Sequence, residues 1–193
     1  MRSTRSASTS TTTIFDVLKA DHVEVLGLLD AAESAKGQNR RGLIEKIIDE
    51  LTAHATAEEV VLYDNIAEAD VAHTMTVEAK EEHLSAARLM SDLLDPGFAD
   101  DVITAKIVVL REQLEHHIEE EEGELFTTAR ALLDDNVAEA LAGEFLARKE
   151  ELMTMPLAVR VQEAIARHQV MGKSLPSKAV ELVARALNAL DPR

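Results

Sequence analysis

The 193-residue sequence contains no cysteine. Disulfide bonds and thiolate metal sites are therefore excluded, and any bound metal must be held by nitrogen and oxygen atoms. Aromatic residues are also scarce, with four phenylalanines, one tyrosine and no tryptophan. Because aromatics are so few, an aromatic that recurs at a fixed place in a motif carries more weight here than in most chains.

Long apolar runs and excess positive charge are missing as well. The longest apolar runs are short, such as residues 107–110, whereas a membrane-spanning helix needs about 20 apolar residues. No apolar stretch follows Arg2 and Arg5, which argues against a secretory signal and predicts a cytoplasmic location. The net charge of −16 disfavours nucleic acid and anionic membranes as partners and favours cations.

The chain shows the apolar periodicity of amphipathic helices and no strand pattern, so we predict an all-α fold. Four helices are expected at residues 14–36, 40–69, 74–94 and 99–133, joined by short connections as in an up-down-up-down four-helix bundle. Thr13 and Asp16 form a variant capping box at the first helix, Gly37 is placed to end that helix, and Pro96 follows the third.

The flanking segments differ from the bundle in composition. Residues 1–12 are rich in Ser and Thr and are predicted to be a disordered tail, which leaves 13–134 for the bundle. Residues 135–193 form a C-terminal helical extension that we expect to pack against it. Its weaker helical stretches are 136–153, 157–171 and 177–190, and Pro156 and Pro176 stand at two of the predicted starts.

The strongest functional signal is an internal repeat at an offset of 63 residues. Each copy has a histidine, a glutamate four residues later and an aromatic five residues after that: His54, Glu58 and Tyr63, then His117, Glu121 and Phe126. Residues four apart share one face of a helix. A further histidine precedes each copy, His22 by 32 residues and His83 by 34.

Each of these four histidines occupies a position that the periodicity reserves for an apolar residue, and two helices add an inward glutamate. Two buried carboxylates are costly unless something compensates their charge. A pair of first-row metal ions bridged by the carboxylates would do so. The predicted metal ligands are His22, His54, Glu58, His83, His117 and Glu121.

Other interpretations exist for single members of this set. A lone histidine on an apolar stripe is usually a hydrogen-bonded core residue, and a lone buried glutamate is usually paired with Lys or Arg. His116 also begins a His-x3-Glu motif with Glu120. It shares its face with charged residues, however, so we choose His117 and Glu121.

Four more predictions concern residues around the site. His73 is expected in an exposed loop, and His168 is expected to be a surface or packing residue, with an additional metal ligand as the alternative. Tyr63 is either a core aromatic or a group that hydrogen-bonds a bound oxygen species or acts as a redox-active phenol. Neither His-Glu-x-x-His nor Glu-x-x-His occurs, which excludes two common helical metal sites.

The ordered ligand set resembles the hemerythrin-like (HHE domain) family over about residues 14–130. The resemblance implies a non-haem, oxo- or hydroxo-bridged di-iron centre in which Glu58 and Glu121 bridge the irons and the four histidines are terminal ligands. Oxygen carriers of the family have an additional histidine near His83. Here Ala79 and Ala87 stand four residues before and after His83, which argues against simple oxygen carriage. The extension is more similar to longer bacterial members.

We therefore expect a di-iron protein that binds hydrogen peroxide, O2 or NO and disproportionates peroxide as a catalase does, with Glu58, Glu121 and Tyr63 as the catalytic candidates. The expected apolar walls are Leu18, Leu51, Met90 and Leu114. One alternative is an O2, NO or iron sensing module that signals through the C-terminal helices. Another is a metal-free helical interaction module.

Overall fold

The computed structural model describes residues 11–171, and their side chains as far as His168. Within this range every regular element is a helix, which confirms the predicted all-α fold. Most of the tail predicted over 1–12, and the helix predicted over 177–190 with Pro176, lie outside the described residues. None of the described helices is both long and apolar enough to cross a membrane.

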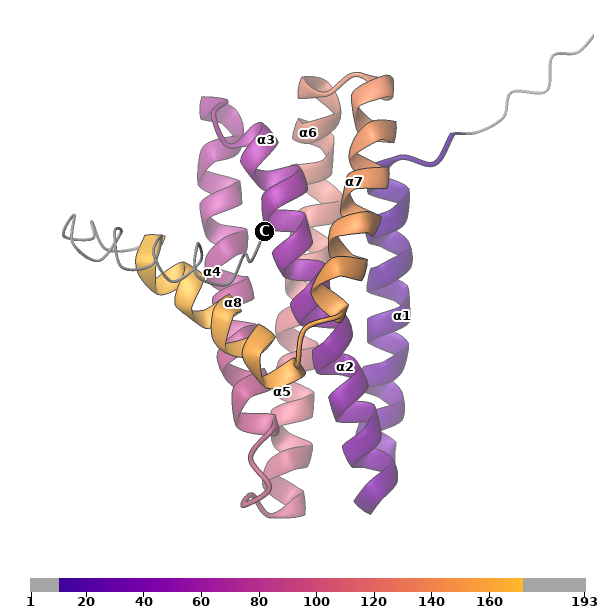
Figure 1. Cartoon of the computed structure of the whole chain (residues 1–193), viewed down its shortest axis with the longest axis vertical. Coiled ribbons are helices and arrows are strands. Elements are labelled where there is room, and N and C mark those ends of the chain that lie inside the picture. The colour runs from indigo at the N-terminus through magenta and orange to yellow at the C-terminus, as the bar shows by residue number, and fades with distance from the viewer. Residues whose placement is uncertain (1–10, 172–193) are drawn as a thin grey trace, which may run out of the picture.

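Four long helices run antiparallel and form the predicted up-down-up-down bundle (Figure 1). Their bounds are Ile14–Ser34 for α1, Gly37–Glu58 for α2, Asp70–Leu93 for α4 and Asp100–Glu120 for α5. Two of them continue beyond a wider π-helical turn. These continuations are η1 (Glu59–Tyr63) with α3 (Asp64–Ile66) after α2, and η2 (Glu121–Leu125) with α6 (Phe126–Leu132) after α5.

Two local predictions about helix ends are wrong. The first helix ends at Ser34, and Gly37 instead begins α2 with a φ of 58°. The chain reverses there within two residues, and the left-handed backbone that it needs is open to glycine. His73 lies within α4 rather than in a loop, although it is exposed as expected. The capping box is present: Asp16 accepts hydrogen bonds from the backbone N–H and the hydroxyl of Thr13.

The core of the bundle consists of two apolar clusters, one towards each end. One cluster contains Phe15, Leu18, Ala57, Leu62, Leu125 and Phe126, among others. The other contains Val25, Leu29, Ile47, Leu51, Met90, Leu110 and Leu114, among others. Along α1, Leu18 belongs to the first cluster and Val25 to the second, and His22 lies between them. The same alternation places a polar layer across the middle of the bundle.

The extension forms α7 (Asp135–Met153) and α8 (Leu157–Met171), close to the predicted ranges, with Pro156 directly before α8. α7 packs against α1 and α2, whereas α8 crosses α2 and α4 obliquely (Figure 1). Phe145 and Val161 are fully buried. Arg160 donates to the carbonyl oxygen of Leu152 and forms an ion pair with Asp49 of α2, which fastens α8 to the bundle.

Candidate metal centre

The structure brings all six predicted ligands together in the polar layer. Each long helix contributes one imidazole, and the two glutamates stand where the π-helical turns begin. All six side chains are buried: His22, His54, Glu58, His83, His117 and Glu121. The imidazoles form two pairs. The ring centroids of His22 and His54 are 5.0 Å apart, and those of His83 and His117 are 4.7 Å apart.

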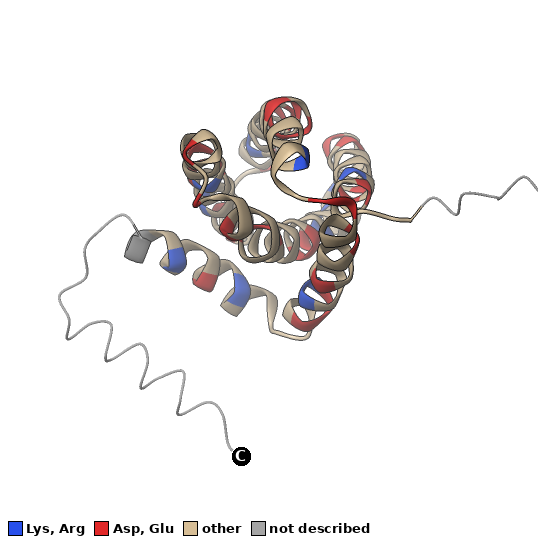
Figure 2. Cartoon of the chain, turned by 90° about the horizontal axis from the view of Figure 1, so that it is seen from above, with Lys and Arg blue, Asp and Glu red and all other residues tan. Residues whose placement is uncertain are grey.

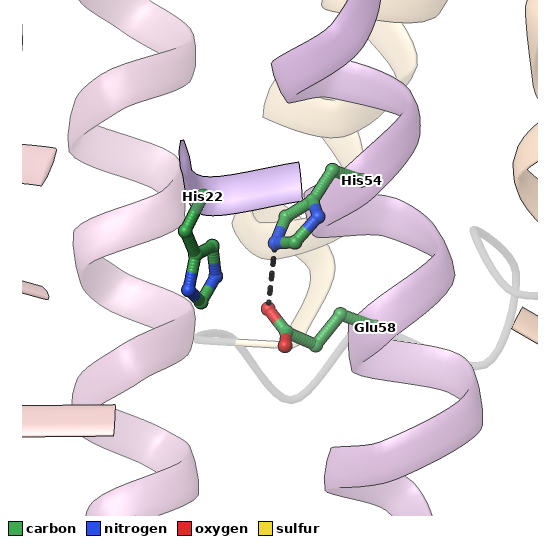
Figure 3. A group of neighbouring side chains, drawn as sticks. All are labelled: His22, His54 and Glu58. Carbon is green, nitrogen blue, oxygen red and sulfur yellow. Dashed lines mark ion pairs between the residues drawn. The ribbon is translucent and has the colours of Figure 1, made fainter. Parts of the chain in front are cut away.

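Each glutamate lies between the two pairs. The Oε2 atom of Glu58 is 3.5 Å from Nε2 of His54 and 3.6 Å from Nε2 of His83. Figure 3 shows the first of these contacts, with His22 alongside. The Oε2 atom of Glu121 is 3.3 Å from Nε2 of His22 and 3.8 Å from Nε2 of His117. Each carboxylate therefore contacts one imidazole from each pair, as a bridging ligand must.

The donor set fits a pair of metal ions. Nε2 of His22, Oε1 of Glu58 and Oε2 of Glu121 are buried without a hydrogen-bond partner, and such atoms are costly unless something binds them. Two groups of ligand atoms, each within 4.8 Å of one another, share Glu58: one with His22 and His54, the other with His83 and His117. Imidazole and carboxylate together suit first-row metals.

A second ring of carboxylates surrounds the histidines, and it was not predicted. Each imidazole has its Nδ1 atom beside a carboxylate: His22 with Glu122 at 2.9 Å, His54 with Asp21 at 3.1 Å, His83 with Glu59 at 2.9 Å and His117 with Glu82 at 2.8 Å. An ionised carboxylate only accepts, so Nδ1 carries the proton in all four rings. The lone pair of Nε2 then points towards the centre, as a metal ligand requires.

A sequence signal for this outer ring exists. Asp21 and Glu82 each directly precede a predicted ligand histidine, and Glu59 and Glu122 each directly follow a predicted ligand glutamate. The internal repeat therefore includes the outer ring. Each of these acids contacts the histidine of another helix, because the side chains of adjacent residues in a helix point about 100° apart.

The π-helical turns explain the aromatic of the repeat. Nine residues of regular α-helix make about two and a half turns, which would place Tyr63 opposite His54. In a π-helical turn the hydrogen bonds join residues five apart, and Tyr63 is five residues after Glu58. Its buried hydroxyl lies 2.7 Å from Oε1 of Glu121 and 3.2 Å from Oε2 of Glu58. Phe126, its counterpart in the repeat, instead packs edge-on against Phe15.

Burial and mutual repulsion set the protonation of the two glutamates when no metal is bound. Burial, reinforced by the charge of Glu121, raises the pKa of Glu58 well above its ordinary value. Burial also opposes the charge of Glu121, but the neighbouring imidazoles of His22 and His117 outweigh it and lower the pKa of Glu121. Burial and the charge of Glu121 raise the pKa of Tyr63 well above 10, so the phenol keeps its proton.

Other candidate residues lie outside the centre. The side chain of His116 is 62% exposed and contacts Glu120 and Glu82 rather than the inner ligands. His168 is buried, contrary to a surface location. Its Nε2 is 2.9 Å from Oε1 of Glu59 in the outer ring, and no contact joins it to the inner ligands among the described side chains.

A pocket of about 470 Å³ lies between α4 and the α5–η2 segment, and its lining includes His117 and Glu121 of the centre. Five further glutamates line it: Glu78, Glu82, Glu119, Glu120 and Glu124. The pocket beside the centre is therefore strongly acidic.

The adjacent histidines provide a matched test of the ligand set. We expect His117→Ala to weaken metal binding by about 100-fold or more, because it removes a buried inner imidazole. We expect His116→Ala to leave metal binding unchanged. Metal content per chain after dialysis against a weak chelator measures both, and equal retention by the two variants would contradict the assignment.

Glu58 generates a pH-dependent prediction for the metal-free protein. The pKa of Glu58 is raised in the folded state, so the contribution of Glu58 to the free energy of unfolding is complete below the ordinary pKa of 4.5 and is lost as the pH rises. In Glu58→Gln no carboxyl titrates at this position, so the variant does not lose stability in this way. The free energy of unfolding of the variant relative to wild type should therefore increase from pH 4.5 upwards, by at most about 1.4 kcal/mol per pH unit.

Urea unfolding in the presence of a chelator at several pH values measures this difference, with Glu120→Gln as an exposed control. A difference for Glu58→Gln that stays constant with pH would show that Glu58 is not held protonated.

Comparisons with known proteins agree with this geometry. The family model "Hemerythrin HHE cation binding domain" matches residues 13–129. A hemerythrin HHE cation binding domain-containing protein from Mycobacterium kansasii has a similar fold, with a TM-score of 0.61 and 22% identity over 84% of this chain and 96% of that one. A DNA nickase from Nostoc sp. is 31% identical over an alignment of 149 residues that covers 72% of this chain. The chain spans 40% of the length of that nickase. With the family model covering more than half of the sequence, the chain belongs to the hemerythrin HHE cation-binding family.

Proposed function

We propose that this protein holds two iron ions in its bundle, binds small oxygen species there and disproportionates hydrogen peroxide to water and oxygen. The observation that carries the proposal is the pairing of four imidazoles into two sets, with Glu58 and Glu121 each in contact with both sets. Two bound iron ions would supply and take back the two electrons that pass from one peroxide molecule to another.

The pocket favours small neutral ligands. Its acidic lining repels anions, whereas hydrogen peroxide, O2 and NO carry no charge. Apolar side chains close the centre on both sides of the polar layer, and the four predicted walls are all buried: Leu18, Leu51, Met90 and Leu114. A small ligand would therefore approach past His117 and Glu121 and meet a dry interior.

The chain itself supplies the groups that hold protons. In the overall reaction, two protons leave the peroxide that is oxidised to O2, and two are taken up as the other peroxide becomes two waters. Tyr63 keeps a proton on its hydroxyl, which lies 2.7 Å from Oε1 of Glu121. We assign Tyr63 as a hydrogen-bond and proton donor at the centre, with Glu121 as its partner.

Oxygen evolution from peroxide by the iron-loaded protein tests the proposal. We expect about two irons per chain, the absorption band of a bridged ferric pair, and a rate far above that of free iron. Tyr63→Phe should keep the iron and the band but lose roughly 100-fold in rate, the low end for a proton-transfer group. A loaded wild-type protein no faster than free iron would remove the enzymatic claim, and an iron-free protein would favour the interaction module.

We also infer a cytoplasmic location and no nucleic-acid or membrane partner. The net charge of −16 disfavours nucleic acid and anionic membranes as partners. Asp and Glu are spread around the whole circumference of the bundle in Figure 2. The word nickase in the name of the Nostoc relative describes a protein of which this chain spans less than half.

A second candidate function is sensing of O2, NO or iron through the C-terminal helices. It is supported by the packing of α7 against α1 and α2 and of α8 against α2 and α4, since these bundle helices carry ligands. If occupancy of the centre shifts those ligands, α7 and α8 should become more or less accessible. Limited proteolysis within residues 136–193, with and without iron, measures this, and identical cleavage in the two states would argue against sensing.

A further inference from the structure

The four carboxylates of the outer ring are not held in the same way. Glu122 is held from within the bundle by Lys19, at 3.0 Å, and among the described side chains the basic partner of Glu82 besides His117 is the exposed His116 at 3.8 Å. The other two have basic partners from the extension, beyond the segment that matches the family model. Lys149 of α7 contacts Asp21, and His168 of α8 contacts Glu59.

Lys149 lies in a partly buried, charged environment beside His54. Its Nζ atom is 2.6 Å from Oδ2 of Asp21 and 3.0 Å from Oε2 of Glu50, and its side chain is 12% exposed. The same Oδ2 atom lies 3.1 Å from Nδ1 of His54. Phe145, one helical turn earlier on α7, packs its ring edge-on against the imidazole of His54, with centroids 5.6 Å apart. α7 thus contacts both the ring of His54 and the acid that orients it.

His168 has the corresponding place beside His83. Its Nδ1 is 2.7 Å from the carbonyl oxygen of Ala164, one turn earlier in α8, and a carbonyl only accepts, so Nδ1 carries a proton. Nε2 then lies 2.9 Å from Oε1 of Glu59. That same oxygen lies 2.9 Å from Nδ1 of His83. Because Nδ1 ties the imidazole of His168 to its own helix, α8 holds the other ring nitrogen beside this carboxylate oxygen.

The extension has other attachments to the bundle besides these charged contacts. Phe145 and Val161 are completely buried, and Arg160 joins α8 to Leu152 and Asp49, neither of which belongs to the outer ring. A helix that served only to cover the bundle would need no charged side chain here, but Asp21 and Glu59 would then lack a basic partner. Buried ion pairs add little net stability, so we interpret these contacts as orienting the two carboxylates.

We propose that Lys149 and His168 are positioning residues of the metal centre, and that α7 and α8 are therefore part of it. Lys149 fixes Asp21, which orients His54, and His168 fixes Glu59, which orients His83. His54 belongs to one imidazole pair and His83 to the other, so the extension orients one ligand for each ion. This inference rests on the proposed function, in which the two pairs hold iron.

The test compares iron release from full-length variants. Lys149→Met and His168→Phe keep the bulk of each side chain but remove the cation beside the outer carboxylate. We expect each to release iron to a chelator about 10–100-fold faster than wild type, the usual effect of losing an outer-ring partner, and to shift the absorption band. Lys149→Arg should restore release to nearly the wild-type rate, because it restores the charge.

Arg160→Met is the matched control for a purely structural role. It removes an ion pair between α8 and α2 but no contact of the outer ring, so it should lower the melting temperature and change the band and the release rate far less than Lys149→Met and His168→Phe do. Wild-type release by both Lys149→Met and His168→Phe would overturn the inference, as would release from Arg160→Met that is as fast as theirs. A wild-type protein that binds no iron would instead refute the proposed function, and this inference with it.

Discussion

Glu58 and Glu121 lie within reach of one tyrosine hydroxyl in the interior of the bundle, and most features of the centre follow from the need to keep two carboxylates there. Without a cation between them, one carboxyl is driven towards its protonated form by burial and by the charge of the other. Two metal ions would remove that repulsion and would occupy the buried atoms that have no hydrogen-bond partner. The four imidazoles are arranged to supply the remaining ligands.

The bundle isolates this polar layer by placing an apolar cluster on either side of it. Along α1, α2 and α4, an apolar residue of one cluster, a histidine and an apolar residue of the other cluster follow at helical spacing, for example Leu18, His22 and Val25. The two apolar clusters thus stabilise the bundle, and the layer between them can hold polar groups. The outer carboxylates then hold each imidazole through its Nδ1 atom, so the inner ligands keep their orientation although they are polar.

The sequence predicts the helices and the inner ring because both follow a regular period. His22, His54, His83 and His117 occupy apolar positions of that period, which makes them visible without a structure. The π-helical turns could not be predicted from it, since one extra residue in a turn barely changes the apolar pattern. The outer ring of carboxylates was not predicted for another reason. In a chain with 36 acidic residues, Asp21 or Glu59 cannot be distinguished by sequence from a solvated surface residue. The role of His168 depends on contacts between helices far apart in sequence.

The repeat is symmetric in its inner ligands and their outer carboxylates, and asymmetric in the groups beyond them. Tyr63 contacts both glutamates, whereas Phe126 packs against Phe15 and has no polar atom to offer. The pocket is lined by His117 and Glu121, so it lies beside one imidazole of the His83–His117 pair. A duplicated half-site alone would make the surroundings of the two imidazole pairs alike. One hydroxyl, one pocket and two added helices therefore distinguish the two halves of the centre.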